Sequence, residues 1–539
     1  MVAMDDPGNN LETRTPIASD ASAKTAWWTW AWHPLLFAVF PVLSLFNVNL
    51  AEVPAGEVVR PLLVMLAAAG LLWGLLALVL RNAHKAALFS TLTLLLFFLY
   101  GNLRGLLRQS ASPLLADCGR DDAFLLRPLV GLLLLAFILL LGTKRDLRGW
   151  TGPLNAAGAF LVLWPLFGIG KTVVPLFFKP APAAATVTAK TAIPPEQLPD
   201  IYYIILDAYA REDTLQRVFH YYNRPFLAHL EEQGFYVARE SRANYCQTHM
   251  SLPSSLNMAY LDTLVPARDA EGRRAQLAAR FDDNAVMREL RGQGYRIVAL
   301  PFEASLNLPS ADLRTPFPEE DAAAVTEFEV MLLSLTPLKL PSSLAQEQTL
   351  NPYELHRRRI KFQLEQLPAA ADGPGPTFVF AHILCPHPPF VLHRKVGEDP
   401  DLTHYTQDGG FYGVGGGTLE EYLSEYPVQL DCLNRMVTKS VDRLLKHARR
   451  PTVIILQSDH GSGAYTDWRH PERIDVRERA FNLCAIYTPD GPLPDLYPGI
   501  TPVNIFRVLF NHYLHTDYPR LPDRSYLAYP GKQIQFPTP

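Results

Sequence analysis

Residues 452–461 read TVIILQSDHG, a short apolar run that ends in a serine, an acid and an imidazole. A run of this length, rich in β-branched side chains and without polar alternation, is typical of a strand buried on both faces of a sheet. Similar runs occur at IYYIIL (201–206), YRIVAL (295–300), TFVFAHI (377–383) and LCAIY (483–487). Helical stretches alternate with them at 284–293, 354–367, 419–447 and 502–514. Residues 200–539 are therefore predicted to form an α/β domain with a largely parallel sheet flanked by helices.

Polar side chains follow three of these strands directly. Asp207 follows the run 201–206, Asp459 and His460 follow 452–457, and His387 comes shortly after 377–383. In open α/β sheets, ligands bind beyond the carboxyl ends of the strands. Because charged residues seldom gather at one edge without a role, we expect these side chains to form a site there.

The residues at this edge are suitable ligands for a divalent metal. Carboxylate oxygens and a neutral imidazole bind zinc or manganese, and three ligands from Asp207, Asp459 and His460 leave a position open for chemistry. Thr248 is a candidate fourth ligand. Coordination would make its hydroxyl, a weak nucleophile when free, easier to ionise.

Thr248 lies in NYCQTHMSLPSSLN (244–257), where a helix could begin. On local grounds an ordinary helix cap is the favoured interpretation, because threonine often accepts a bond from an unpaired backbone N–H. The alternative is a nucleophile. Both roles are compatible, since a helix N-terminus also favours an incoming phosphate.

The N-terminal part differs from residues 200–539 because it contains long apolar stretches. Five stretches are apolar and close to the roughly 20 residues that a helix needs to cross a bilayer. They are 34–50, 61–80, 86–103, 123–143 and 151–170. We therefore predict a five-helix transmembrane domain over residues 26–178, preceded by a flexible cytoplasmic tail at 1–25.

The charges of the short loops give an orientation. Arg81 and Lys85 follow the second span, and Lys144, Arg145 and Arg148 follow the fourth. Positive residues stay on the cytoplasmic side, so everything after the fifth span is predicted to be exported. A Pro- and Ala-rich linker at 179–199 would join the two parts.

The overall charge excludes one class of partner. The net charge is -4 and no long basic run occurs, so the electrostatic footprint of a nucleic-acid-binding protein is missing. The five cysteines are widely spaced without a CxxC pair, and they predict neither a zinc knuckle nor a redox motif.

Short motifs in the exported half resemble those of the alkaline phosphatase and sulfatase superfamily. The nearest resemblance is to its membrane-anchored phosphotransferases, the lipid A phosphoethanolamine transferases and lipoteichoic acid synthases, which also join five spans to an exported α/β domain. TxxSLP at 248–253 is similar to the Thr-x-x-Ser-Val-Pro of the phosphoethanolamine transferases, and SDHG at 458–461 to the superfamily's metal-binding Asp-His pair. Asp207 in LDAYAR stands at the first acidic ligand, which is glutamate in the transferases and aspartate in phosphatases and sulfatases.

The resemblance also bears on the type of reaction. Sulfatases of this superfamily modify a Cys or Ser within C/S-x-P-x-R, and the residues after Cys246 contain neither that proline nor that arginine. Phosphoryl chemistry is therefore preferred. His387 resembles the histidine that family members place near the transferred phosphate, with His382 as an alternative. Arg211 matches an arginine after the first acidic ligand, displaced by one residue.

Three further residues are candidates from their positions. Arg479 and His470 follow the SDHG turn and are expected to clamp phosphate oxygens or a leaving group. Asn244 is expected to orient the nucleophile.

Together these observations predict an enzyme of a bacterial inner membrane with its catalytic domain on the extracytoplasmic side. It would transfer a phospho-head group, of phosphoethanolamine or phosphoglycerol type, from a phospholipid to an envelope glycan or lipid through an ester on Thr248. A hydrolase, either phosphodiesterase or phosphatase, is the first alternative. A catalytically silent membrane protein that binds envelope glycan or lipid is the second. Metal content and the effect of Thr248→Ala separate the enzymes from the silent binder.

Overall fold

The structure is a computed structural model that describes residues 30–50, 53, 55–108, 112, 118, 122–178, 193–265, 270–301, 308–317, 326–338, 352–394, 417–468, 470–529 and 532–535. The predicted tail at 1–25 lies outside the described residues. So does most of the predicted linker at 179–199.

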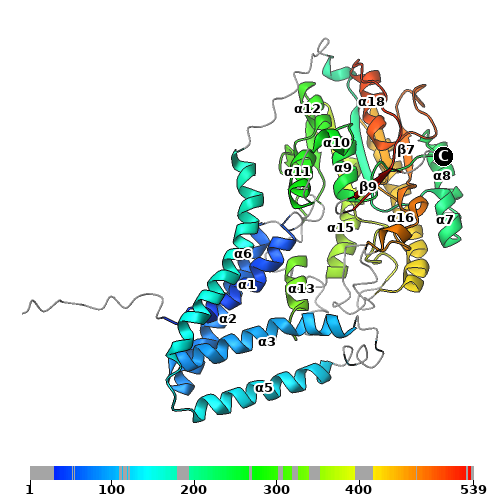
Figure 1. Cartoon of the computed structure of the whole chain (residues 1–539). Coiled ribbons are helices and arrows are strands. Elements are labelled where there is room, and N and C mark those ends of the chain that lie inside the picture. Colours follow the sequence, from blue (N-terminus) through cyan, green and yellow to red (C-terminus); the bar gives the residue numbers. More distant parts are fainter. Residues whose placement is uncertain are drawn as a thin grey trace, which may run out of the picture.

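The N-terminal helices occupy the predicted stretches. They are α1 (His33–Val48), α2 (Ala55–Leu80), α3 (Ala83–Arg108), α5 (Asp122–Gly142) and α6 (Thr151–Phe178), drawn in blue and cyan in Figure 1. Among the described residues, four helices are long and apolar enough to cross a membrane, namely α2, α3, α5 and α6. Four of the five predicted spans therefore meet the length and composition that a membrane-crossing helix needs, and α1 does not.

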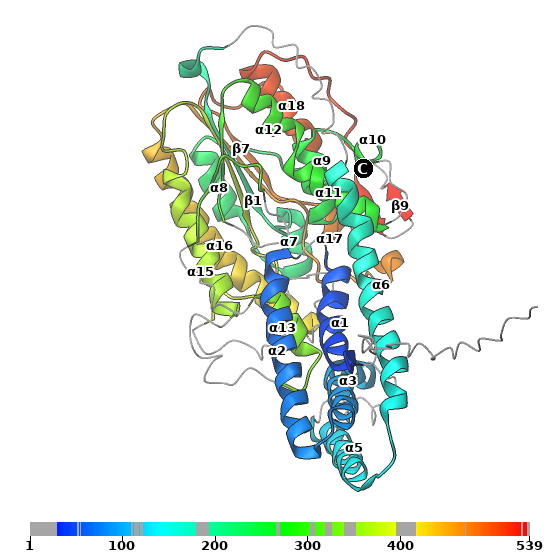
Figure 2. The same ribbon diagram turned by 90° about the vertical axis from the view of Figure 1, so that its left-hand side faces the viewer.

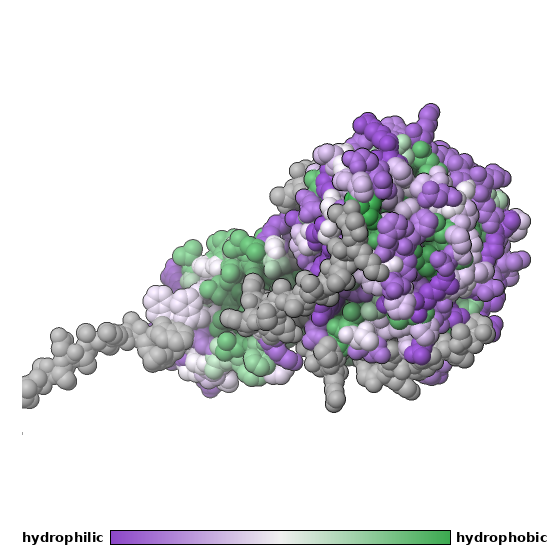
Figure 3. Space-filling model, turned by 90° about the horizontal axis from the view of Figure 1, so that it is seen from above, coloured by the Kyte–Doolittle hydropathy of each residue, from purple (hydrophilic) through white to green (hydrophobic). Residues whose placement is uncertain are grey.

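The first helix falls short because of its length. α1 has 16 residues, which correspond to about 24 Å of helix, whereas a bilayer core is about 30 Å thick. Apolar side chains gather on the surface of the membrane helices, and polar ones cover most of the opposite part of the molecule (Figure 3).

The C-terminal half contains a seven-stranded mixed sheet in the order β2-β7-β6-β1-β5-β3-β4. Its centre is β1 (Asp200–Leu206), which pairs in parallel with β5 (Thr377–Ile383) and β6 (Thr452–Gln457). The remaining strands are β3 (Arg296–Ala299) and β4 (Leu313–Arg314) on one side and β7 (Cys484–Tyr487) and β2 (Tyr236–Val237) on the other.

The predicted "largely parallel" character applies to part of this sheet only. β3 is parallel to both β5 and β4, but β7 is antiparallel to β6, and β2 is antiparallel to β7. An apolar run does not reveal strand direction, because burial on both faces looks the same in either orientation. A separate hairpin pairs β8 (Tyr526–Tyr529) with β9 (Lys532–Gln535).

Alternation along β1 divides its side chains between two apolar layers. Tyr202, Ile204 and Leu206 face one layer, and Ile201, Tyr203 and Ile205 face the other. The first layer is covered by α7 (Glu212–Phe219), α8 (Arg224–Glu232), α15 (Pro352–Gln366) and α16 (Leu419–His447). The second is covered by α9 (Thr248–Leu256), α12 (Ala285–Gly292), α18 (Pro502–Tyr513) and the end of α11 (Ala270–Asp282). Figure 2 shows α15 and α16 on one side of the strands and α9 and α12 on the other.

One helix of the C-terminal half packs on the N-terminal helices. α13 (Glu327–Ser334) stands over α3 in Figure 1, and its Phe328 and Leu332 join a buried cluster with side chains of α1, α2 and α3. The Phe328 ring meets Phe46 of α1 edge-on, with 6.5 Å between ring centroids. Arg60 of α2 forms an ion pair with Glu329. This contact joins the C-terminal half to the N-terminal helices.

We expect Gly101→Ala to weaken this contact. Gly101 of α3 donates its backbone N–H to Leu335 O at 2.9 Å, and a Cβ atom there would overlap the backbone of Ser334 and Leu335. Overpacking of this kind typically costs about 1–3 kcal/mol. The matched control is Gly105→Ala on the same helix, where a Cβ would meet nothing within 4 Å. Thermal unfolding in detergent should show a lower midpoint for Gly101→Ala alone; equal midpoints would contradict the close contact.

Candidate active site

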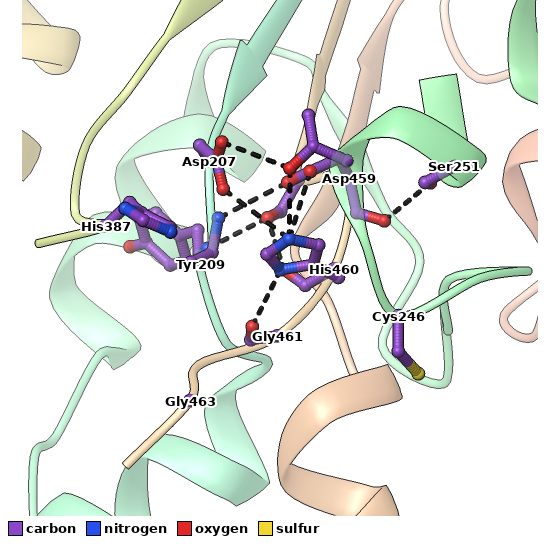
Figure 4. A network of polar contacts seen from close by, with 12 residues as sticks. Asp207, Tyr209, Cys246, Ser251, His387, Asp459, His460, Gly461 and Gly463 are labelled. Carbon is purple, nitrogen blue, oxygen red and sulfur yellow. Dashed lines mark hydrogen bonds and ion pairs between the residues drawn. The ribbon is translucent and has the colours of Figure 1, made fainter. Parts of the chain in front are cut away.

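The carboxyl ends of β1 and β6 bring three titratable side chains together. Asp207 follows β1, and Asp459 and His460 follow β6; all three are at most 1% exposed. The Nε2 atom of His460 lies 3.3 Å from Asp459 Oδ2 and 3.7 Å from Asp207 Oδ1. Figure 4 shows the imidazole of His460 facing both carboxylates. The parallel register, which pairs Ile205 with Gln457, places the two strand ends side by side.

Thr248 contributes its hydroxyl to the same cluster. Its Oγ1 atom lies 3.2 Å from His460 Nε2 and 3.4 Å from Asp207 Oδ2. Thr248 is the first residue of α9, and the N-cap is Gln247, whose side chain makes no capping bond. The interpretation of Thr248 as an ordinary cap was therefore wrong, because its hydroxyl faces the carboxylates rather than the helix backbone. Ser251, one turn later, donates to Asp459 O at 2.7 Å and ties α9 to the SDHG turn.

His382 lies nearer to the carboxylates than its sequence position suggested. Its Nε2 atom is 3.1 Å from Asp207 Oδ2. Ligand atoms of Asp207, His382 and Asp459 all lie within 4.8 Å of one another, which is compact enough to hold a metal ion. A signal for this position was present in the alternation of β5, since Phe378, Phe380 and His382 share a side, and both phenylalanines belong to the layer covered by α9.

His387 contacts the site through its backbone. Its N–H donates to Asp207 O at 3.1 Å, and its ring Nδ1 lies 2.6 Å from Pro388 O. The side chain is 6% exposed, and its charge interacts with Asp207.

Electrostatics affect the three buried groups in different directions. Burial would raise the pKa of Asp207, but His387 and then His382 act in the opposite direction, and that pKa lies below its usual range. Burial, followed by the charge of Asp207, raises the pKa of Asp459. Burial and then Arg479 lower the pKa of His460, so its imidazole is neutral. The site thus contains a neutral imidazole and two carboxylates that repel each other when both are ionised.

A divalent cation fits these residues. Asp207 Oδ1 and Asp459 Oδ2 are buried without a hydrogen-bond partner among the described residues. Buried carboxylate oxygens are normally satisfied, and a cation between them would remove both their repulsion and their lack of partners.

Arg479 forms hydrogen bonds with two loops around the cluster. It is 4% exposed and donates to Cys246 O at 2.9 Å and to Gly461 O at 3.2 Å. It therefore connects the segment that carries Thr248 with the SDHG turn. Its Nη2 atom also lies 3.2 Å from His460 Nε2.

The other three candidates lie in separate networks. Asn244 donates to Arg524 O at 2.8 Å and accepts from Val503 N at 3.0 Å, so it anchors the C-terminal segment and the start of α18. Arg211 donates to Ser241 O at 2.9 Å and stacks over the Phe481 ring at 3.8 Å. The side chain of His470 is 50% exposed and lies 3.4 Å from Glu472 Oε1.

Sequence reasoning missed Glu478, which holds the loop after the SDHG turn. Its buried carboxylate accepts from Ser462 Oγ at 2.9 Å, Ala464 N at 2.6 Å and Tyr465 N at 3.0 Å. Gly461 is required beside it, because a Cβ there would overlap the carbonyl oxygens of Glu478 and Phe481. No local pattern marks a glutamate for such a role, since its partners are all distant in sequence.

Comparison with protein-family models and with curated proteins gives no match. Among solved structures, the chain is similar to the C-terminal periplasmic domain of EptC from Escherichia coli, at 12% identity over 63% of this chain and 92% of that one, with a TM-score of 0.39. It is also similar to the integral membrane protein lipooligosaccharide phosphoethanolamine transferase A from Neisseria meningitidis, at 12% identity over 85% and 88% of the two chains and a TM-score of 0.34. A protein in the alkaline phosphatase superfamily from Vibrio parahaemolyticus matches at 12% identity over 62% and 73%, with a TM-score of 0.35.

Proposed function

We propose that this chain is a membrane-anchored, metal-dependent phosphotransferase of the alkaline phosphatase and sulfatase superfamily. The observation that carries the proposal is the position of the Thr248 hydroxyl, 3.2 Å from His460 Nε2 and 3.4 Å from Asp207 Oδ2, within a buried cluster of carboxylates and imidazoles. A threonine serving only to begin a helix would have no need of these neighbours.

The cation would be held by Asp207, Asp459, His460 and Thr248, with His382 as a further donor. Zinc or manganese suits this mixture of oxygen and imidazole ligands. When bound, the cation would lower the cost of ionising the threonine hydroxyl and neutralise charge that develops on the phosphoryl oxygens. The chain's own residues hold the hydroxyl in place. α9 carries Thr248, and Ser251 and Arg479 fix α9 and its preceding loop against the SDHG turn.

The reaction proceeds in two displacements. Thr248 Oγ1 attacks the phosphorus of a phospholipid, its proton passes to solvent or the leaving group, and the bond to the diacylglycerol oxygen breaks. The product is a phosphothreonine ester that carries the head group. The hydroxyl of an envelope glycan or lipid then attacks phosphorus, its proton passes to Thr248 Oγ1 directly or through solvent, and the bond between phosphorus and Thr248 Oγ1 breaks.

The membrane part supports a lipid donor. Four helices are long and apolar enough to cross a membrane, and α13 of the C-terminal half packs on the N-terminal helices, which would keep that half at a membrane surface. With the basic loops on the cytoplasmic side, the site lies on the extracytoplasmic side of a bacterial inner membrane. The head group is of phosphoethanolamine or phosphoglycerol type.

A hydrolase is the second candidate. The observation that favours it is Asp207 itself, because the resembling transferases have glutamate at this position whereas phosphatases have aspartate. Water would then replace the glycan or lipid hydroxyl in the second displacement. The first displacement would be unchanged.

The test is capture of the ester. Purified full-length protein in detergent, loaded with Zn²⁺ or Mn²⁺, is incubated with phosphatidylethanolamine or phosphatidylglycerol and analysed by intact mass. We expect a head-group adduct that maps to Thr248 and is missing from Thr248→Ala. Release of soluble head group without acceptor would identify the hydrolase, and neither adduct nor release from any phospholipid would leave the silent binder.

A further inference from the structure

The residue directly after Asp207 has an unusual backbone conformation. Ala208 has a φ of 62° and is fully buried. Side chains other than glycine, asparagine and aspartate seldom adopt this left-handed conformation, because Cβ crowds the following carbonyl oxygen. Such a conformation persists only where surrounding contacts hold it in place, and it often occurs at functional sites.

A single hydroxyl closes the turn that contains Ala208. Tyr426 Oη donates to Ala208 O at 2.8 Å and accepts from Ala210 N at 3.1 Å. The turn is also joined to the SDHG segment, where Ala208 N donates to Asp459 Oδ1 at 3.3 Å and Tyr209 N donates to Ser458 Oγ at 2.8 Å. The tyrosine therefore bonds the carbonyl oxygen of the strained residue and the N–H group two residues later.

The position of Tyr426 is itself fixed by packing. Its buried ring stacks on Phe219 of α7, with 4.4 Å between centroids, and on Tyr422 one turn earlier in α16. Tyr422 Oη accepts from Gly463 N at 3.1 Å, and Gln429 Oε1 accepts from Val391 N at 2.6 Å. Positions 422, 426 and 429 are spaced so that they share one face of a helix. This face of α16 thus holds the loops that follow β1, β5 and β6.

We propose that Tyr426 is a positioning residue that keeps Ala208 in the left-handed conformation and so orients the Asp207 carboxylate for the cation. The inference rests on the proposed function, because it assigns the orientation of Asp207 to metal binding. Tyr426 acts through the backbone of residues 208–210, which bonds to its hydroxyl. Loss of the hydroxyl would let Ala208 relax towards negative φ and turn Asp207 away from Asp459.

The test uses Tyr426→Phe, which keeps the stacked ring and removes only the hydroxyl. We expect the affinity of full-length protein in detergent for Zn²⁺, measured by competition with a chromophoric chelator, to fall about tenfold, as for other residues that support metal ligands. Adding Ala208→Gly should restore most of that affinity, because glycine adopts positive φ without the crowding of a Cβ. Ala208→Gly alone should bind Zn²⁺ nearly as the unmodified protein does.

The matched control is Tyr422→Phe, which removes a hydroxyl of the same helix face that bonds to Gly463 instead. Adding Ala208→Gly to Tyr422→Phe should not raise the Zn²⁺ affinity of that variant. Unchanged affinity in Tyr426→Phe, or a failure of Ala208→Gly to restore it, would overturn the inference while leaving the proposed function intact.

A second measurement is independent of metal. In thermal unfolding of the metal-free protein, Tyr426→Phe should lower the midpoint and Ala208→Gly should recover part of the loss. If the unmodified protein bound no divalent cation, the metal-dependent function would fail, and this coupling between Tyr426 and Ala208 would still test whether the hydroxyl holds the turn. If Ala208→Gly offset the effect of Tyr426→Phe neither on Zn²⁺ affinity nor on thermal unfolding, the inference would be wrong.

Discussion

Thr248→Ala is expected to lower head-group transfer by at least about 10,000-fold, as removal of a nucleophile does in other enzymes with covalent intermediates. The substitution removes the atom that attacks phosphorus and one donor to the cation, but it leaves α9 in place because Gln247, not Thr248, is the N-cap. The measurement is single-turnover transfer from radiolabelled phosphatidylethanolamine or phosphatidylglycerol, with intact mass run in parallel.

Two variants make that result interpretable. Thr248→Ser keeps a hydroxyl and should retain measurable transfer and a head-group adduct. Thr263→Ala removes a threonine hydroxyl that bonds Tyr260 O in the short helix α10 (Leu261–Leu264), and it should behave as the unmodified protein. Transfer by Thr248→Ala at more than a small percentage of the unmodified rate would show that the threonine is not the nucleophile.

Asp459→Asn is expected to weaken metal binding by more than about 100-fold, beyond the loss typical of residues that only support ligands, and to abolish transfer. The amide has the shape of the carboxylate but lacks the charge that faces Asp207 and His460. Metal binding is measured by chelator competition and transfer as for Thr248. In the unmodified protein, a chelator should remove activity, and added Zn²⁺ or Mn²⁺ should restore it.

The same substitution should not destabilise the metal-free protein. Burial and the neighbouring charge of Asp207 raise the pKa of Asp459, which means that ionising Asp459 in the folded state is unfavourable without a cation. A neutral amide removes that cost, so the metal-free variant should unfold at the same temperature as the unmodified metal-free protein or higher. Asp442→Asn on α16, where the carboxylate lies 2.9 Å from His229 Nε2 and is 43% exposed, is the control and should leave metal binding unchanged. Tight metal binding by Asp459→Asn would contradict the proposed ligand set.

Much of the architecture could be predicted from the sequence because its signals are local. The runs 377–383 and 452–457 coincide with β5 and β6, and the stretch 419–447 coincides with α16. Each signal depends on the apolar pattern within one element. Strand direction does not depend on that pattern. The antiparallel pairing of β7 with β6 and with β2 was therefore not predicted. The stretch 34–50 was counted as a span from its apolar composition, although the helix it forms, α1, has only 16 residues.

The site was predictable to the extent that it consists of strand ends. Asp207, Asp459 and His460 follow β1 and β6, and the geometry of a parallel sheet brings such residues together. The bracing function of Arg479 and the contacts of Glu478 and Tyr426 had no such signal. Their partners are backbone groups of other loops, and no pattern of residue types records where a carbonyl oxygen will lie.

Residue types and their spacing were thus enough to predict long apolar helices, an α/β domain and a group of carboxylate and imidazole side chains at one sheet edge, because burial pattern and side-chain chemistry are properties of single elements. The direction of the Thr248 hydroxyl, the approach of His382 to Asp207 and the strained turn at Ala208 required the folded chain. Thr248 lies 41 residues from Asp207 and 212 from His460. Whether atoms so far apart in sequence come within bonding distance depends on how helices pack on the sheet, which is a cooperative property of the whole domain.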